Sequence, residues 1–145
     1  LYSQALQAYH QAQAIYQAID DLGGEGATST LIGSTYRDLN QPREALNAYL
    51  QAYTAYQGSQ SSKLSETGLK LNSPKETATI LSYIGRLYRS YGKHEFALKA
   101  FQKALELSRK ISDDNGAAGA LTLIGRTYLE QKQYAKAMET SQQAL

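Results

Sequence analysis

Apolar residues recur every three or four positions along most of the chain, with polar residues between them. Leu81, Ile84 and Tyr88 follow this spacing, and a second run over residues 97–105 repeats it. Side chains spaced in this way lie on one face of an α-helix, so each run predicts an amphipathic helix with one buried side. The chain has no useful length of alternating apolar and polar residues, which would indicate a strand. The pattern therefore predicts an all-α protein.

The same series of small and aromatic residues occurs three times with identical internal spacing. In each copy a glycine precedes a tyrosine, and a second run beginning with alanine follows after a short break. Two helices for each copy follow from this arrangement, and duplication is its simplest explanation. The copies are Gly33, Tyr36, Ala45, Tyr49 and Ala52; Gly85, Tyr88, Ala97, Phe101 and Ala104; and Gly125, Tyr128, Ala137, Ser141 and Ala144.

The repeat has a period of 40 residues, which separates Ala97 from Ala137, and one junction carries 12 extra residues. Part of the series also occurs at Ala5, Tyr9 and Ala12, so we expect a fourth copy that begins before residue 1. The expected organisation is a single array in which 1–19 form the second helix of a truncated repeat, 24–57, 74–112 and 115–145 are repeats, and 58–73 are an insertion.

Short breakers separate the two helices of each hairpin. Pro42 suits the first turn of a helix, Gly92 suits a left-handed position after a helix, and Lys132-Gln133 breaks the third copy. Ser73-Pro74-Lys75-Glu76 resembles a capping box and predicts a helix from Pro74 to about Tyr91.

Two segments rich in small residues are expected to be irregular. Gly23-Gly24-Glu25-Gly26 lacks the lysine and hydroxyl residue of a phosphate-binding loop, so we expect a flexible turn between repeats. The serine-rich insertion over 58–73 predicts a solvated loop. The alternative is that it extends the flanking helices or leans over a binding groove.

The glycine of each copy lies in the middle of an expected helix, where glycine costs roughly 1 kcal/mol relative to alanine. We therefore expect it to allow a close approach to the alanine that begins the second helix. The aromatic residue four positions after that alanine, Tyr49 or Phe101, is expected to pack between neighbouring hairpins, because one hairpin cannot bury its whole apolar stripe.

This series resembles the tetratricopeptide repeat, which implies a right-handed superhelical solenoid of antiparallel helical hairpins. The usual repeat has about 34 residues. The longer period is more similar to kinesin light chains, LGN-like adaptors and bacterial arrays attached to CHAT protease-like domains. The junctions Ile19-Asp20-Asp21 and Ile111-Ser112-Asp113 favour the bacterial arrays. The chain departs from the family pattern at Ser141, where an aromatic residue belongs.

Composition excludes several classes of function. The absence of cysteine among 145 residues excludes disulfide scaffolds and thiolate chemistry, and a net charge of +2 argues against nucleic-acid binding. His10 and His94 have no carboxylate at metal-ligand spacing. We also find no catalytic constellation and no apolar run that could span a bilayer. We expect a cytoplasmic protein that is not an enzyme and has no metal, cofactor, membrane or nucleic-acid partner.

Arginines mark the candidate binding face. In the resembled fold the first helices line a concave face, and the residues one and four positions after each glycine point into it. No acid stands at Ser90, so Arg86 and Arg89 are the strongest candidates for an anionic anchor, although solvated surface is the alternative. The candidate site comprises Arg37, Arg86, Arg89 and Arg126 with the hydroxyl residues Ser34, Ser90 and Thr122.

The sequence therefore predicts a non-catalytic interaction module, part of a larger multidomain protein, that binds a peptide or helix of another protein or another part of its own chain. The arginines predict that this partner is acidic. The alternative is self-assembly through the open ends of the array, where apolar stripes lack the neighbouring repeat that would cover them.

Overall fold

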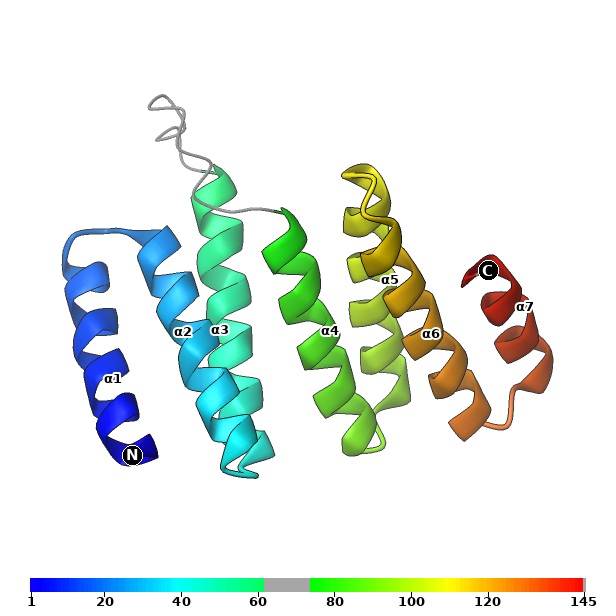
Figure 1. The fold of residues 1–145 in the computed structure, drawn as a ribbon, viewed down its shortest axis with the longest axis horizontal. Coiled ribbons are helices and arrows are strands. Elements are labelled where there is room, and N and C mark those ends of the chain that lie inside the picture. The colour runs from blue at the N-terminus through cyan, green and yellow to red at the C-terminus, as the bar shows by residue number, and fades with distance from the viewer. Residues whose placement is uncertain (62–73, 145) are drawn as a thin grey trace. The chain divides into compact units, whose positions relative to one another are not determined.

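The computed structural model describes residues 1–61 and 74–144, which form seven α-helices and no strand (Figure 1). This confirms the expected all-α fold. The expected capping residue Ser73 and most of the 58–73 insertion lie outside the described residues, but the third helix continues as far as Ser61. The helices are α1 (Tyr2–Ala18), α2 (Leu22–Asp38), α3 (Pro42–Ser61), α4 (Pro74–Ser90), α5 (His94–Lys110), α6 (Asp114–Glu130) and α7 (Tyr134–Ala144).

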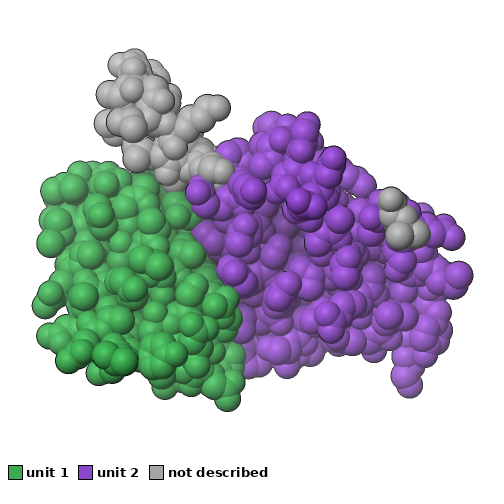
Figure 2. Space-filling model, viewed as in Figure 1, with its two compact units in different colours: residues 1–73 green, residues 74–145 purple. Residues whose placement is uncertain are grey.

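The helices belong to two compact units, residues 1–73 and 74–145, which Figure 2 shows in different colours. In the first unit, α2 packs against both α1 and α3. In the second unit, α5 packs against α4 and α6, and α6 also packs against α7. Each unit is thus a series of helical hairpins that cover one another, as expected for a tetratricopeptide-like solenoid.

All the turns between consecutive helices within a unit have the same backbone geometry. One residue of each turn adopts a left-handed conformation, with φ between 55° and 71°. The amide of the next residue then donates to a carbonyl in the last turn of the preceding helix, at 2.8–2.9 Å. This closure satisfies carbonyls that the end of a helix leaves free. The left-handed residues are Asp20, Asn40, Gly92, Ser112 and Lys132.

The turns also fix where the next helix begins. Asp21 accepts a hydrogen bond from the Gly24 amide at 2.9 Å, and Asp113 accepts one from the Gly116 amide at 3.1 Å. Each aspartate therefore caps the helix that follows it. The two Ile-x-Asp junctions of the sequence have a common physical meaning: the middle residue closes one helix and the aspartate opens the next.

The expectation of a flexible turn at Gly23–Gly26 was wrong, because these residues lie in the first turns of α2. A Cβ atom on Gly24 would overlap the ring of Tyr16, and one on Gly26 would lie 2.5 Å from the ring of Tyr56. The glycines therefore make room for tyrosines of α1 and α3. Small size, rather than flexibility, explains their place in the helix.

The glycines in the middle of the first helices are packed against rings, not against the backbone that we expected. A Cβ atom on Gly33 would lie 2.8 Å from the ring of Tyr49, and one on Gly85 would overlap the ring of Phe101. Both rings are fully buried. Tyr49 and Phe101 thus pack inside their own hairpins. Phe101 also clusters with Leu123 and Ile124 of the next hairpin, so the expected packing between hairpins holds for this residue.

The third hairpin lacks this contact because Ser141 replaces the ring. The nearest atom to a Cβ on Gly125 is the Ser141 hydroxyl oxygen at 3.6 Å, followed by the carbonyl oxygen of Ala137 at 3.7 Å. These are ordinary van der Waals distances, so a methyl group would fit at this position.

Alanine substitutions at the two glycines of the second unit should have opposite effects. Gly85→Ala should lower the free energy of unfolding by about 1–3 kcal/mol, since the buried Phe101 ring cannot move aside without strain. Gly125→Ala should raise it by up to about 1 kcal/mol through helix propensity alone. Urea denaturation of both variants checks this expectation, and a change of the same sign in both would contradict the ring contact.

Candidate functional site

Arg86 and Arg126 occupy equivalent exposed positions on α4 and α6, one residue after Gly85 and Gly125. The two helices are in contact with each other within the second unit. Among the described residues, neither guanidinium has a hydrogen bond or an ion pair. Thr122 is exposed one turn before Arg126, and its hydroxyl donates to the Ala118 carbonyl at 2.9 Å. The polar face of α4 and α6 therefore presents two cations without a counter-charge.

Arg89 has an acidic partner in the following hairpin, which the sequence analysis of its own copy did not identify. Its Nε atom lies 3.5 Å from Oε1 of Glu130, which comes from the following hairpin. Its side chain is only 16% exposed, and its Nη1 atom is buried without a hydrogen bond. The expectation that Arg89 faces no acid, because Ser90 follows it, is therefore corrected. Ser90 itself is exposed, and its hydroxyl donates to the Leu87 carbonyl at 2.7 Å.

Glu130 makes a second contact, with the start of α5. Its Oε2 atom lies 3.8 Å from Nδ1 of His94, the first residue of α5. Glu130 therefore connects α6 with α4 and with α5, at the end of the helices where the chain turns. Glu130 and Arg126 do not form the ion pair that their spacing on the helix would allow.

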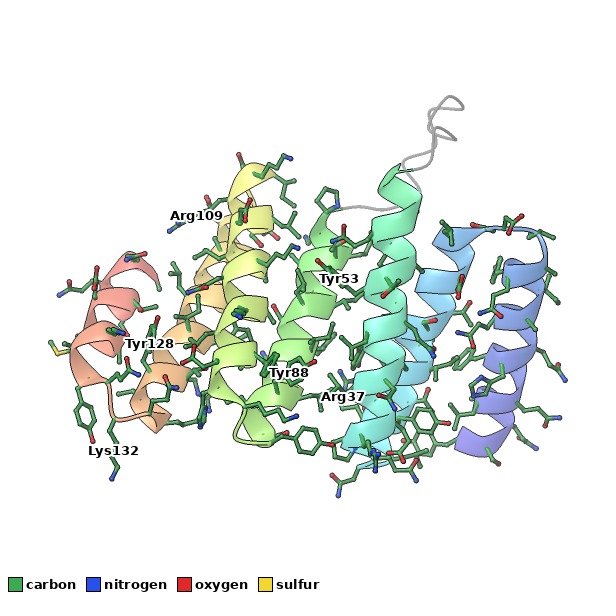
Figure 3. The ribbon with its side chains drawn as sticks, turned by 180° about the vertical axis from the view of Figure 1, so that it is seen from behind. Arg37, Tyr53, Tyr88, Arg109, Tyr128 and Lys132 are labelled. Atoms are coloured by element: carbon green, nitrogen blue, oxygen red, sulfur yellow. The ribbon has the colours of Figure 1, made fainter. Side chains whose placement is uncertain are left out.

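In the first unit the residues that correspond to Arg86 and Arg89 are Ser34 and Arg37, and both have side-chain partners. Arg37 of α2, labelled in Figure 3, pairs with Asp38, its neighbour in the chain, at 3.1 Å. Ser34 is half-buried, and its hydroxyl is 3.1 Å from the phenolic oxygen of Tyr49. Ser34 thus supports the hairpin through the ring that packs on Gly33, while Arg37 stays partly solvated.

Neither metal chemistry nor a membrane span is supported by the described residues. In the ranges 1–61 and 74–144, no group of three or more histidine, aspartate or glutamate side chains could hold a metal ion. No helix in these ranges is long and apolar enough to cross a membrane.

A signal for the contact between Arg89 and Glu130 exists in the sequence, although only the repeat register reveals it. Arg89 is four residues after the glycine of its copy, and Glu130 is five residues after the glycine of the next copy. Within one copy, Ser90 takes the place of the acid. Reading each copy by itself therefore missed a partner that lies one period away.

The comparisons with known proteins agree with the helical hairpins. Family models of the tetratricopeptide repeat match residues 28–58 and 76–145. No curated protein matches the chain. The repeats of this family typically serve as non-catalytic modules of protein–protein interaction and as scaffolds.

Solved structures resemble the chain in fold. BtubC (BKLC) from P. vanneervenii is 14% identical, with a TM-score of 0.67 over 99% of this chain and 56% of that protein. A signal transduction ATPase with a tetratricopeptide repeat sensor, from Pyrococcus horikoshii, is 17% identical, with a TM-score of 0.51 over 86% of this chain and 24% of that protein. This chain therefore spans only part of either protein. From its repeated series, its hairpins and these matches, the chain belongs to the tetratricopeptide repeat family.

Proposed function

We propose that the chain binds an acidic peptide or helix of another protein on the polar face of α4 and α6. The observation that carries this proposal is the pair of exposed arginines, Arg86 and Arg126, which lack an acidic partner among the described residues. A guanidinium can hold a carboxylate through two parallel hydrogen bonds. Two such groups on neighbouring helices provide two anchor points for one acidic segment.

The neighbouring residues define secondary roles in this proposal. Thr122 and Ser90 add exposed hydroxyl groups to the same helices. Arg89 contributes less than we expected from the sequence, because Glu130 already neutralises its charge. Arg37 and Ser34 belong to the first unit, where Arg37 pairs with Asp38 and Ser34 keeps a structural role, so the proposed site on α4 and α6 does not include them.

A second candidate function is self-association through the outer face of α7. Met138 is 66% exposed, whereas Leu98, at the same position of α5, is only 6% exposed because it packs with Leu123 and Ile124 of α6. Tyr134 is also exposed on α7. An apolar surface of this kind is typical of a face that another helix covers.

Reversing the charge of both anchors should weaken binding of an acidic peptide. For Arg86→Glu with Arg126→Glu, we expect about a tenfold loss of affinity for a glutamate-rich peptide, because two exposed ion pairs each contribute up to about 1 kcal/mol. Isothermal calorimetry at low and high salt measures the effect, which screening should reduce.

The matched control for this pair is Arg109→Glu with Lys110→Glu, which makes the same change of net charge on exposed residues of α5. We expect the control to keep most of the affinity. A glutamine-for-glutamate version of the peptide should bind weakly to every variant. Equal losses in both double variants would show that only net charge matters and would contradict a site on α4 and α6.

Removing the charge of Glu130 should change stability and affinity in opposite directions. In Glu130→Gln, Arg89 loses its ion pair, so we expect the free energy of unfolding to fall by about 1 kcal/mol. The released positive charge should raise affinity for the glutamate-rich peptide about threefold. Glu106→Gln, an exposed residue of α5, is the control, and an equal gain in affinity there would refute a local effect.

Self-association is tested by a concentration series in light scattering. If the outer face of α7 drives it, the apparent mass should rise with concentration, and Met138→Glu should abolish the rise. A constant monomer mass across the series would exclude this second function.

A further inference from the structure

A groove of about 340 Å³ lies in the second unit, between α5 and α7, with α6 as its floor. Leu121 and Ile124 are buried at the bottom, and Leu105 and Tyr128 are half-buried beside them. The rim is polar, and Lys136 of α7 stands over the Tyr128 end. Apolar depth with a few polar groups at the edge is the usual composition of a binding pocket, and this volume is at the lower end of the usual range.

The groove is separate from the arginine face. Successive residues of an α-helix are about 100° apart, so Ile124 in the floor and Arg126 on the arginine face point about 160° away from each other around α6. Figure 3 looks onto α5 and α7, with Tyr128 labelled between them. A ligand in the groove would therefore contact different residues from one bound at Arg86 and Arg126.

The preceding hairpin shows which kind of side chain packs over the tyrosine that corresponds to Tyr128. In the α4–α5 hairpin, Phe96 packs over Tyr88 with 5.3 Å between ring centroids. In the α6–α7 hairpin, Lys136 occupies the position of Phe96, and its ammonium lies 5.5 Å from the centroid of the Tyr128 ring. The third hairpin has thus replaced a ring with a cation on a flexible stem, beside an apolar groove.

The positive charge of Lys136 favours a ligand that carries a negative group. Its Nζ atom has the Tyr128 ring as a partner, and among the described residues it makes no ion pair with a carboxylate. Lys136 is exposed, and a cation held over a ring at a solvent-exposed site is only weakly bound, so it can move aside for a ligand. Glu139, one turn further along the rim, disfavours a second acid there.

We infer that this groove binds a partner peptide that carries an aromatic side chain next to a single carboxylate. The aromatic ring packs on Tyr128, Leu121 and Ile124, as Phe96 packs on Tyr88. The carboxylate pairs with Lys136, and the amides of Gln102 and Gln143 on the rim are available to the peptide backbone. This site acts independently of the proposed binding of acidic segments by α4 and α6.

The probe is a short peptide with one phenylalanine followed by one glutamate in a neutral sequence. We expect it to shift the amide NMR signals of Ile124 and Tyr128. Replacing its phenylalanine by alanine should cost about tenfold in affinity, since ring burial and ring packing are both lost. Replacing its glutamate by glutamine should cost up to about fivefold, the value of one exposed ion pair.

Two variants of the protein make the test specific. Lys136→Phe restores the ring found at Phe96 and should fill the site by itself, so peptide binding should disappear while the helical circular dichroism signal stays unchanged. Lys136→Glu should weaken binding several-fold, and Lys110→Glu, with the same charge change elsewhere in the second unit, should not.

The Arg86→Glu, Arg126→Glu variant separates this site from the proposed function. Unchanged binding of the phenylalanine peptide to this variant supports an independent groove. If the variant loses that peptide, or if Lys136→Phe binds it as well as the unmodified chain does, the groove is not the site and the inference is overturned. A mass that changes with concentration only when Lys136 is intact would assign the groove to contacts between copies, which also overturns it.

Discussion

The packing of an aromatic ring on a glycine is the contact on which the α2–α3 and α4–α5 hairpins depend. Tyr49 covers Gly33 and Phe101 covers Gly85, and both rings are fully buried. Because each glycine lacks a Cβ atom, the ring lies directly on the backbone of the first helix, and the two helices approach closely. The same contact fixes the rotation of the first helix about its axis. That rotation places the next residue of α4, Arg86, on the exposed surface, whereas the equivalent residue of α2, Ser34, stays within hydrogen-bond distance of the Tyr49 hydroxyl. The position of the binding residues is therefore a consequence of core packing.

The electrostatics of the second unit couple the stacking of hairpins to the binding face. Glu130 contacts Arg89 of α4 and His94 of α5, so one carboxylate joins two hairpins. The same carboxylate neutralises the charge of Arg89, which would otherwise be available to a ligand. Arg86 and Arg126 remain without such a partner. The number of arginines on a face thus overstates the positive charge that a partner protein meets.

Most of the fold was predictable because it depends on local signals. The spacing of Leu81, Ile84 and Tyr88 gives the helical face, and Pro42 and Gly92 mark a helix start and a helix end that the structure has. Gly23–Gly26 were misread because glycine usually signals a turn, whereas here rings from two other helices require its small size. The partner of Arg89 and the groove beside Tyr128 depend on residues one helix or one repeat away. Such features require the stacking itself, which no single copy encodes.

The turns have a practical consequence for chemical work on this molecule. Five different residue types, Asp20, Asn40, Gly92, Ser112 and Lys132, occupy the same left-handed position, and all of them are exposed. Backbone hydrogen bonds close each turn, so the identity of the side chain there has little influence on the path of the chain. A cysteine introduced at Lys132 or Ser112 would be the sole thiol in this cysteine-free sequence. These positions are thus suited to attaching a fluorophore, a spin label or a surface tether without disturbing the helices.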